Sequence, residues 1–280
     1  MLTTVDGIPV HYTEHGSGTP VLALHGAGVD HREIMGALEP LFADRPGYRR
    51  IYPDLPGMGR TPAPDTVNSN DDVVEVLLGL VDAVIGEQAF LVVGHSYGGY
   101  LARAIANRRP GQVAGLALVC GVDAQARPGE IPEHVVLHAA DDLDLDATLE
   151  PAMAVEFRDY LVVQTPATLR RFQETVAPGV ALADQPALQR IFERWRLRTP
   201  PEQGPAYTNP TLILTGRQDA TAGYAGSWRL LEHYPRATFA VLDRAGHALL
   251  HEQVGLAPAL LAEWLDRVRE QRATTPARDH

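Results

Sequence analysis

Three residues that lie far apart in the chain have the types that nucleophilic catalysis needs: Ser96, His247 and Asp219. A serine hydroxyl is a weak nucleophile, so it requires a histidine base within hydrogen-bond reach and an acid that orients this histidine. Ser96 is the centre of GHSYG at residues 94–98, after an apolar run and before a helical pattern. This context favours a catalytic serine over an ordinary glycine-rich turn, because the flanking glycines let strand and helix pass closely.

His247 is the preferred base. It follows Gly246 in the loop after the last predicted strand, whereas the other histidines fall on a hairpin, on surface helices, in the tail or beside other functional loops. His247 and His251 are four residues apart, which would also suit a zinc site. No glutamate lies between them, as a helical zinc-protease motif would need, so we expect no metal site.

Two aspartates are candidates for the acid that orients the histidine. Asp219 ends the sequence LILTGRQD at residues 212–219, a buried strand followed by a glycine turn. It also precedes His247, which is the order that accompanies a serine on a strand–turn–helix motif. Asp123 follows the preceding strand and is the rival acid, and a turn or helix-capping aspartate is the structural alternative for Asp219. We favour Asp219 because of its position after the buried strand.

Acyl transfer also needs N–H donors for the negative charge that develops on the carbonyl oxygen. The backbone N–H of Tyr97, directly after the serine, is the first candidate for this oxyanion hole. The second should come from the sequence HGAG at residues 25–28, which ends a strand of its own. We select the N–H of Ala27, with that of Gly28 as the second choice.

Strands and helices alternate around these residues. Residues 2–15 predict a hairpin of two edge strands, and apolar runs predict further strands at residues 20–24, 48–54, 89–93, 113–120, 211–215 and 238–242. Helical patterns occur at residues 31–43, 73–84, 224–233 and 254–269. Such alternation is typical of an α/β fold with a mostly parallel sheet that helices cover on both faces.

Residues 122–206 interrupt this alternation, since they show only helical patterns broken by prolines. We therefore expect an α/β core of residues 1–121 and 207–280. Residues 122–206 would form a helical cap above the carboxyl ends of the strands, where open α/β sheets bind ligands. Aromatic residues of this cap are candidates for contact with a substrate: Phe157, Tyr160, Phe172 and Trp195. Apolar residues at helical spacing more often hold such a cap to its core.

The composition narrows the class of protein. All 24 basic side chains are arginine, which excludes Schiff-base chemistry on lysine, pyridoxal-phosphate anchoring and a serine–lysine dyad. The formal net charge of −11 disfavours nucleic acid and anionic membranes as partners. The single cysteine, Cys120, excludes an intrachain disulfide. Residues 1–10 lack a basic, apolar leader and no run reaches membrane-spanning length, so we expect a cytoplasmic protein that acts on a small molecule.

Five motifs together resemble the α/β-hydrolase superfamily across nearly the whole chain, in both order and spacing. They lie at residues 25–28, 54–59, 94–99, 216–219 and 246–247. The resemblance implies an eight-stranded, mostly parallel sheet with a helical cap between the sixth and seventh strands, a triad of Ser96, Asp219 and His247, and no cofactor. Epoxide hydrolases and haloalkane dehalogenases of this superfamily carry aspartate where this chain has Ser96, and hydroxynitrile lyases depend on a lysine that it lacks.

These observations predict a serine hydrolase that cleaves a small, largely apolar ester, thioester, lactone or amide through an acyl-enzyme intermediate. A cofactor-free lyase, cyclase or acyltransferase could use the same pocket. A binding protein that keeps the fold without turnover is the alternative from another class, because fold alone does not determine function. The matched set of serine, histidine, acid and donor loops argues against this last alternative.

Overall fold

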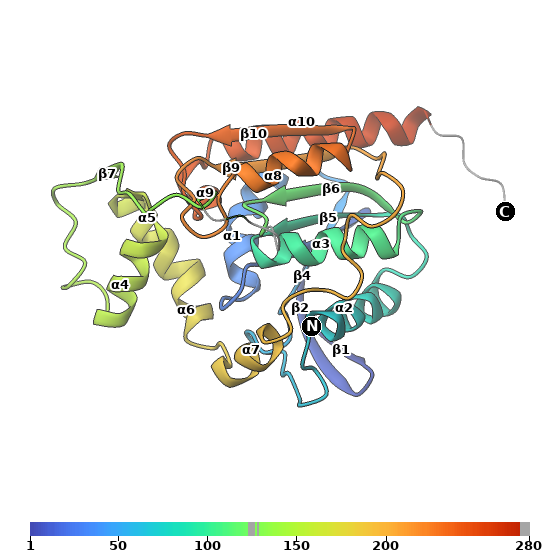
Figure 1. Cartoon of the computed structure of the whole chain (residues 1–280), viewed down its shortest axis with the longest axis horizontal. Helices are drawn as coiled ribbons and strands as arrows, with labels where there is room; N and C mark the ends of the chain where they lie inside the picture. Colours follow the sequence, from blue (N-terminus) through green and yellow to red (C-terminus); the bar gives the residue numbers. More distant parts are fainter. Residues whose placement is uncertain (123–126, 128, 275–280) are drawn as a thin grey trace.

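The computed structural model of the chain describes residues 1–122, 127 and 129–274 (Figure 1). Its centre is an eight-stranded sheet in the order β1-β2-β4-β3-β5-β6-β9-β10. The six strands from β4 to β10 in this order are parallel, whereas the hairpin β1–β2 is antiparallel and lies at one edge. The strands are β1 (Leu2–Val5), β2 (Ile8–Gly16), β3 (Thr19–Leu24), β4 (Tyr48–Pro53), β5 (Phe90–His95), β6 (Val113–Val119), β9 (Thr211–Gly216) and β10 (Ala237–Leu242). The predicted eight-stranded, mostly parallel sheet is confirmed.

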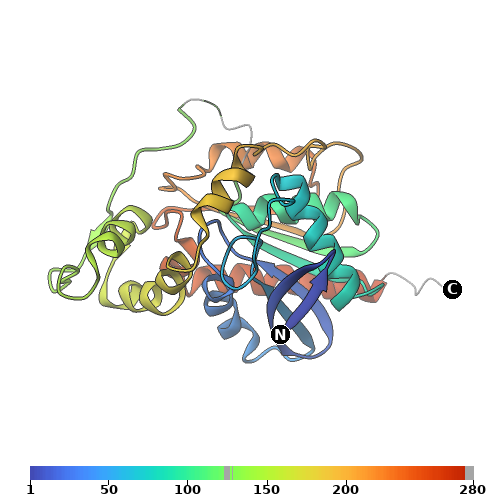
Figure 2. The same cartoon turned by 90° about the horizontal axis from the view of Figure 1, so that it is seen from below.

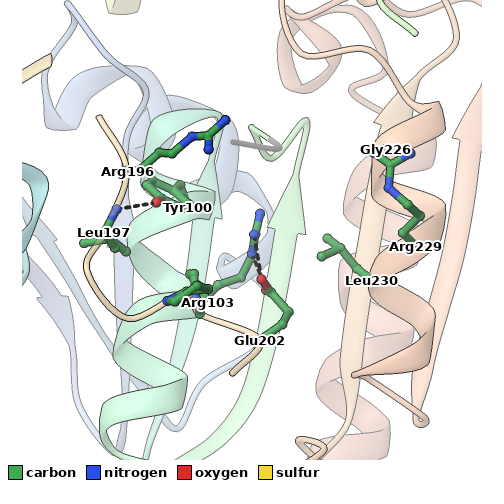
Figure 3. Close-up of a pocket in the computed structure, with 10 residues that line it drawn as sticks. Tyr100, Arg103, Arg196, Leu197, Glu202, Gly226, Arg229 and Leu230 are labelled. Atoms are coloured by element: carbon green, nitrogen blue, oxygen red, sulfur yellow. Dashed lines mark hydrogen bonds and ion pairs between the residues drawn. The ribbon is translucent and has the colours of Figure 1, made fainter. Parts of the chain in front are cut away.

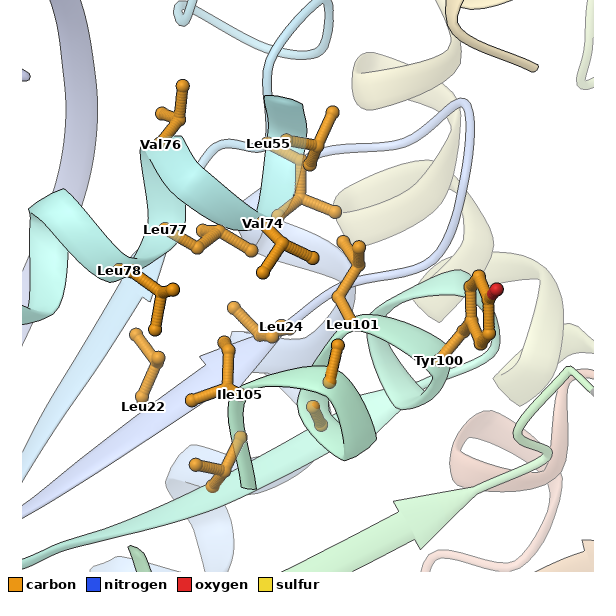
Figure 4. Packing of buried hydrophobic residues seen from close by; sticks show 14 of the residues in the cluster. Leu22, Leu24, Leu55, Val74, Val76, Leu77, Leu78, Tyr100, Leu101 and Ile105 are labelled. Carbon is orange, nitrogen blue, oxygen red and sulfur yellow. The ribbon is translucent and has the colours of Figure 1, made fainter. Parts of the chain in front are cut away.

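Helices cover both faces of the sheet, as the apolar runs of its central strands require. In β3 the side chains of Leu22 and Leu24 pack against α2 and α3 (Figure 4), and those of Val21 and Ala23 face the opposite side with α1 and α10. The period of two along the strand therefore separates two apolar cores. The core helices are α1 (His31–Phe42), α2 (Asn70–Val84), α3 (Tyr97–Arg108), α8 (Ala225–Arg229), α9 (Leu249–Glu252) and α10 (Leu256–Thr274).

The strand order changes direction between β3 and β5. The chain passes from β3 outward to β4 and then returns to β5 on the other side of β3, so that α1 and α2 lie on opposite faces. A crevice forms at such a point, outside the carboxyl ends of the strands, and it is where open α/β sheets bind ligands. The loops that follow β3 and β5 carry residues 25–28 and Ser96, so the fold brings both to the place where the strand order changes direction.

Residues 138–192 lie between β6 and β9, and we call them the cap. They lie beyond the carboxyl ends of the strands in both views (Figure 1, Figure 2), and the chain then returns beside α3 to β9. The helices of the cap are α4 (Pro151–Tyr160), α5 (Pro166–Arg171), the π-helical turn Phe172–Val176, α6 (Ala177–Val180) and α7 (Gln185–Phe192). The prediction that this segment has helical patterns only was wrong in one respect. Two short strands, β7 (His138–Ala139) and β8 (Val163–Gln164), pair in parallel. Their pairing joins backbone groups that are distant in sequence, which a local pattern does not reveal.

Helix ends differ modestly from those expected. The helix expected at residues 254–269 is α10, which begins at Leu256 and ends at Thr274, and the short α9 before it was not predicted. Pro258 fits the first turn of α10, where a missing N–H costs nothing. The helix expected at residues 224–233 is only α8 followed by a 3-10 turn at Leu230–Glu232. Among the described helices, none combines the length and the hydropathy needed to cross a membrane.

Candidate functional site

Ser96 lies on a strained turn between β5 and α3. Its φ of 53° and ψ of −118° place a residue with a side chain in a region that favours glycine, which costs about 1–3 kcal/mol. The neighbouring glycines are required by contact: a Cβ on Gly94 would lie 2.3 Å from the Gly98 carbonyl oxygen, and one on Gly98 would lie 2.2 Å from the Leu24 carbonyl oxygen. The turn therefore presents the serine side chain at the carboxyl end of β5.

A chain of hydrogen bonds joins the three residues singled out by their types. The Ser96 Oγ lies 2.8 Å from His247 Nε2. The His247 Nδ1 lies 3.0 and 2.9 Å from the two carboxylate oxygens of Asp219. Ser96 follows β5, Asp219 follows β9 and His247 follows β10, so three parallel strands deliver one residue each to the same edge. A nucleophile, a base and an orienting acid need this arrangement.

Asp219 is fully buried and its carboxylate is well supplied with donors. Burial alone would raise its pKa, but the neighbouring His247 and the N–H groups of Ala222 and Thr221 outweigh burial and lower the pKa of Asp219. The two backbone donors lie 2.8 and 2.9 Å from Oδ1. The acid is thus held ionised and fixed in orientation beside the imidazole. The rival acid Asp123 lies outside the described residues.

The loop at residues 25–28 lies beside Ser96. A Cβ built on Gly26 would be 3.5 Å from the Ser96 Cβ. The Gly28 N–H donates to Met58 Sδ at 3.2 Å, so this donor is already engaged. Within the described part of the chain, no acceptor is found for the N–H of Ala27 or of Tyr97. These two donors are therefore available to a bound group.

Two acidic residues hold neighbouring loops in place. Buried Asp54 accepts from His11 Nδ1 at 2.8 Å, from His31 Nδ1 at 2.7 Å and from the Arg60 N–H at 2.9 Å. Glu252 accepts from the Gly246 N–H at 2.7 Å and from two N–H groups of the cap, at residues 162 and 163. Sequence reasoning missed Glu252, because only folding brings residue 252 to residues 162 and 163.

The four aromatic candidates of the cap occupy different environments. The Tyr160 ring packs edge-on to the His247 ring, with 6.2 Å between ring centroids. Phe157 and Phe172 are buried against each other, inside the cap's own apolar cluster. Trp195 packs on the rings of Tyr97 and Tyr100, where the chain returns from the cap to the core. Of the four, Tyr160 is the one placed beside the hydrogen-bonded residues.

Among the described residues, two groups of side chains have the ligand types of a metal site, and protein contacts account for both. His95, Cys120 and His247 approach one another, but both His247 nitrogens already bind Ser96 and Asp219. His11 and His31 place Nδ1 directly against Asp54, at distances that leave no space for an ion between them. His247 and His251, the pair with zinc-like spacing, face different partners, since His251 Nε2 points to Glu33 at 3.5 Å.

A cavity of about 300 Å³ lies apart from Ser96, between α3, the chain returning from the cap, and α8 (Figure 3). Tyr100 OH accepts from the Leu197 N–H at 3.0 Å, and the Arg103 guanidinium pairs with Glu202 at 2.6 Å. These contacts bind the returning chain to α3. The cavity's lining includes none of Ser96, Asp219 and His247.

Comparisons with known proteins agree with this architecture. A family model described as "Alpha/beta hydrolase family" matches residues 21–264. A 2-hydroxymuconate semialdehyde hydrolase of Pseudomonas sp. is 26% identical over 92% of this chain and 91% of that protein. A pimeloyl-(acyl-carrier protein) methyl ester esterase of Legionella pneumophila is 25% identical over 85% of this chain and 91% of that protein. The crystal structure of an alpha/beta superfamily hydrolase from Oenococcus oeni matches with a TM-score of 0.85 and 28% identity, over 93% of this chain and 96% of that one.

Proposed function

The chain belongs to the alpha/beta hydrolase family, and we propose that it is a serine hydrolase that cleaves a small, largely apolar ester, thioester, lactone or amide. The observation that carries this proposal is the hydrogen-bonded chain from Ser96 Oγ through His247 to Asp219. The backbone strain at Ser96 supports this proposal. A serine with positive φ is energetically costly, and such strained residues are typical of functional sites.

In this proposal Ser96 Oγ attacks the carbonyl carbon while His247 Nε2 takes the hydroxyl proton. The negative charge on the carbonyl oxygen is bound by the N–H groups of Ala27 and Tyr97. The proton then passes from His247 to the leaving group, which departs as an alcohol, thiol or amine and leaves an acyl-enzyme. Water repeats the sequence with His247 as base, so that the acid product is released and Ser96 recovers its proton. Asp219 stabilises the imidazolium in both halves.

The substrate class rests on the cap and on the relatives. Tyr160 supplies an aromatic wall beside His247, which suits an apolar acyl group. The methyl ester esterase relative supports an ester substrate. The other relative supports a trial with 2-hydroxymuconate semialdehyde, the compound in its name. The sequence has no phosphate-binding loop and its formal net charge is −11, so a phosphate or nucleotide substrate is disfavoured.

A fluorophosphonate probe tests the proposal directly, because it reacts with an activated serine and not with a merely structural one. The wild-type chain should be labelled on Ser96, and Ser96→Ala should not be labelled. Ester turnover on a panel of p-nitrophenyl esters should disappear in the same variant. Absence of labelling in the wild type would contradict the serine mechanism and favour a binding protein. Turnover that persists in Ser96→Ala would favour a lyase or cyclase without an acyl-enzyme.

A further inference from the structure

A second acid–histidine group is buried behind His247. Glu33 of α1 is only 1% exposed, although it is a carboxylate. Its Oε1 lies 3.0 Å from His95 Nδ1 and 3.5 Å from His251 Nε2. Within the described residues, neither Glu33 oxygen has a hydrogen bond of standard geometry. The ion-pair partners found for Glu33 in the described residues are these two histidine rings, and a buried carboxylate is costly unless it is paired.

The other side of the His95 ring contacts the proposed base. His95 Nε2 lies 3.0 Å from the main-chain carbonyl oxygen of His247. A carbonyl oxygen only accepts, so Nε2 must carry a proton and donate it. His95 Nδ1 then faces the Glu33 carboxylate, which also accepts. The two contacts together define which way the His95 ring is oriented, and they require a proton on each nitrogen when Glu33 is ionised.

The electrostatics agree with this assignment. Burial by itself would lower the pKa of His95, but the Glu33 carboxylate outweighs burial and raises it. Burial would raise the pKa of Glu33, yet the two histidines hold the pKa of Glu33 well below its usual range. Both shifts favour the charged forms of His95 and Glu33, whose nearest atoms lie 3.0 Å apart.

We propose that Glu33 and His95 act together as positioning residues for His247: Glu33 fixes the His95 ring, and His95 Nε2–H fixes the His247 main-chain carbonyl. The imidazole of His247 then stays aligned between Ser96 and Asp219. This inference rests on the proposed function, in which His247 is the base. The opposite side of the same loop is held by Glu252 through the Gly246 N–H, so His95 supplies the restraint on His247 itself.

The test uses two amide variants of His95 that differ only in reach. A glutamine amide nitrogen comes close to the position of Nε2, whereas the asparagine amide stops near Nδ1. We expect His95→Asn to lower the rate of fluorophosphonate labelling of Ser96 and kcat for ester hydrolysis about 10- to 100-fold, with little change in KM. A reacting group that is misplaced by about 1 Å lowers reaction rates by about this factor. His95→Gln should stay within about 3-fold of the wild type.

Glu33→Gln should slow labelling about 5-fold, and the double variant with His95→Asn should be no slower than His95→Asn alone, because Glu33 acts through His95. Glu39→Gln is the matched control. It changes the same residue type on the same helix, and Glu39 pairs with Arg50 away from the site, so it should leave the labelling rate unchanged. Thermal unfolding of each variant verifies that the fold is retained.

The outcomes separate the two proposals. A wild type that is not labelled overturns the serine mechanism and this inference with it. A labelled wild type with equal rates for His95→Asn and His95→Gln overturns only the positioning role, as do additive effects of Glu33→Gln and His95→Asn. Should His95→Asn fail to fold, the comparison of Glu33→Gln with Glu39→Gln decides, because equal labelling rates in these two variants contradict the role of Glu33.

Discussion

At the scale of single residues, Ser96 combines a hydroxyl at hydrogen-bond distance from His247 with a backbone conformation that suits glycine. The structure tolerates the strain because both faces of β5 are packed and α3 is buried against one of them. A residue retained against this cost is expected to have a function other than packing. Two substitutions at this position therefore separate its chemistry from its conformation.

Ser96→Gly should raise the free energy of unfolding by about 1 kcal/mol while it abolishes activity, because glycine relieves the strain at positive φ. Ser96→Ala should lower kcat at least about 10⁴-fold without raising the free energy of unfolding. Urea unfolding and ester hydrolysis measure the two effects. An equal stability for the two variants would contradict backbone strain at this residue.

Asp219→Asn should lower kcat about 10³- to 10⁴-fold, because the amide does not hold the histidine tautomer that accepts the serine proton. Asparagine matches aspartate in size and keeps an oxygen that can accept from the Thr221 and Ala222 N–H groups, so the fold should be retained, and thermal unfolding verifies it. The same substitution at Asp123 is the control and should cost little. A larger loss at Asp123 than at Asp219 would transfer the role of the acid to the segment after β6.

At the scale of elements, Asp54 joins the hairpin, α1 and the loop at residues 54–60. It accepts from His31 of α1, from His11 of β2 and from the Arg60 N–H of its own loop. Burial opposes ionisation, but the hydrogen bonds from His31 and from the Arg60 N–H outweigh it, and the pKa of Asp54 lies well below its usual range. The loop that carries Met58, the partner of the Gly28 N–H, depends on this contact.

Asp54→Asn should lower the free energy of unfolding at pH 7 by about 1–3 kcal/mol, since buried donors lose their ionised acceptor. The folded-state pKa of Asp54 is depressed, so its stabilisation is present above the unfolded value of about 3.9 and is lost as the pH falls toward the folded value. The difference in the free energy of unfolding between the wild type and Asp54→Asn should therefore become smaller below about pH 4. Urea unfolding between pH 7 and pH 3 measures it.

Asp65→Asn is the control for this experiment, because the Asp65 side chain is exposed and no similar group of donors surrounds it. Its unfolding curves should match those of the wild type across the pH range. Parallel stability curves for the wild type and Asp54→Asn down to pH 3 would contradict a depressed pKa of Asp54 as the source of the stabilisation.

At the scale of the whole molecule, the α/β core supplies the hydrogen-bonded residues and the cap lies over the ends of the strands. The cap has an apolar cluster of its own around Phe157 and Phe172. It is joined to the core at both sides of the site. Glu252 binds residues 162 and 163, and Asn70 joins the Tyr97 hydroxyl to the Trp195 carbonyl, with contacts of 2.6 Å on each side of the amide.

This division predicts different effects for two aromatic residues of the cap. Tyr160→Ala should change the preferred acyl length on a panel of p-nitrophenyl esters with two to twelve carbons, because Tyr160 lies beside His247. Phe172→Ala should leave the preference unchanged and lower stability by about 3–5 kcal/mol, as expected for truncation of a buried phenylalanine. A shift in chain-length preference with Phe172→Ala alone would place the acyl site inside the cap cluster.

Much of the architecture is determined locally and could be read along the chain. Buried strands have apolar runs because both faces of a parallel sheet are covered. Gly94 is required by the close approach of β5 and α3, and Gly98 by the Leu24 carbonyl oxygen of β3. The apolar runs and the glycine spacing around Ser96 are each visible within a short stretch of the sequence. For this reason a mostly parallel sheet with Ser96, Asp219 and His247 after its strands could be predicted from patterns, and the count of eight strands came from the resemblance of the motifs to the α/β-hydrolase superfamily.

Tertiary structure decided which distant side chains meet outside the sequence motifs. Glu33 reads as one polar residue of an amphipathic helix, and only folding buries it against His95 and His251. The pairing of β7 with β8 and the contact of Glu252 with residues 162 and 163 have the same origin. The aromatic residues of the cap follow one helical pattern in the sequence. Phe157 and Phe172 nevertheless fill the interior of the cap, whereas Tyr160 lies beside His247. Helical spacing specifies a face, and what covers that face depends on segments far away in the chain.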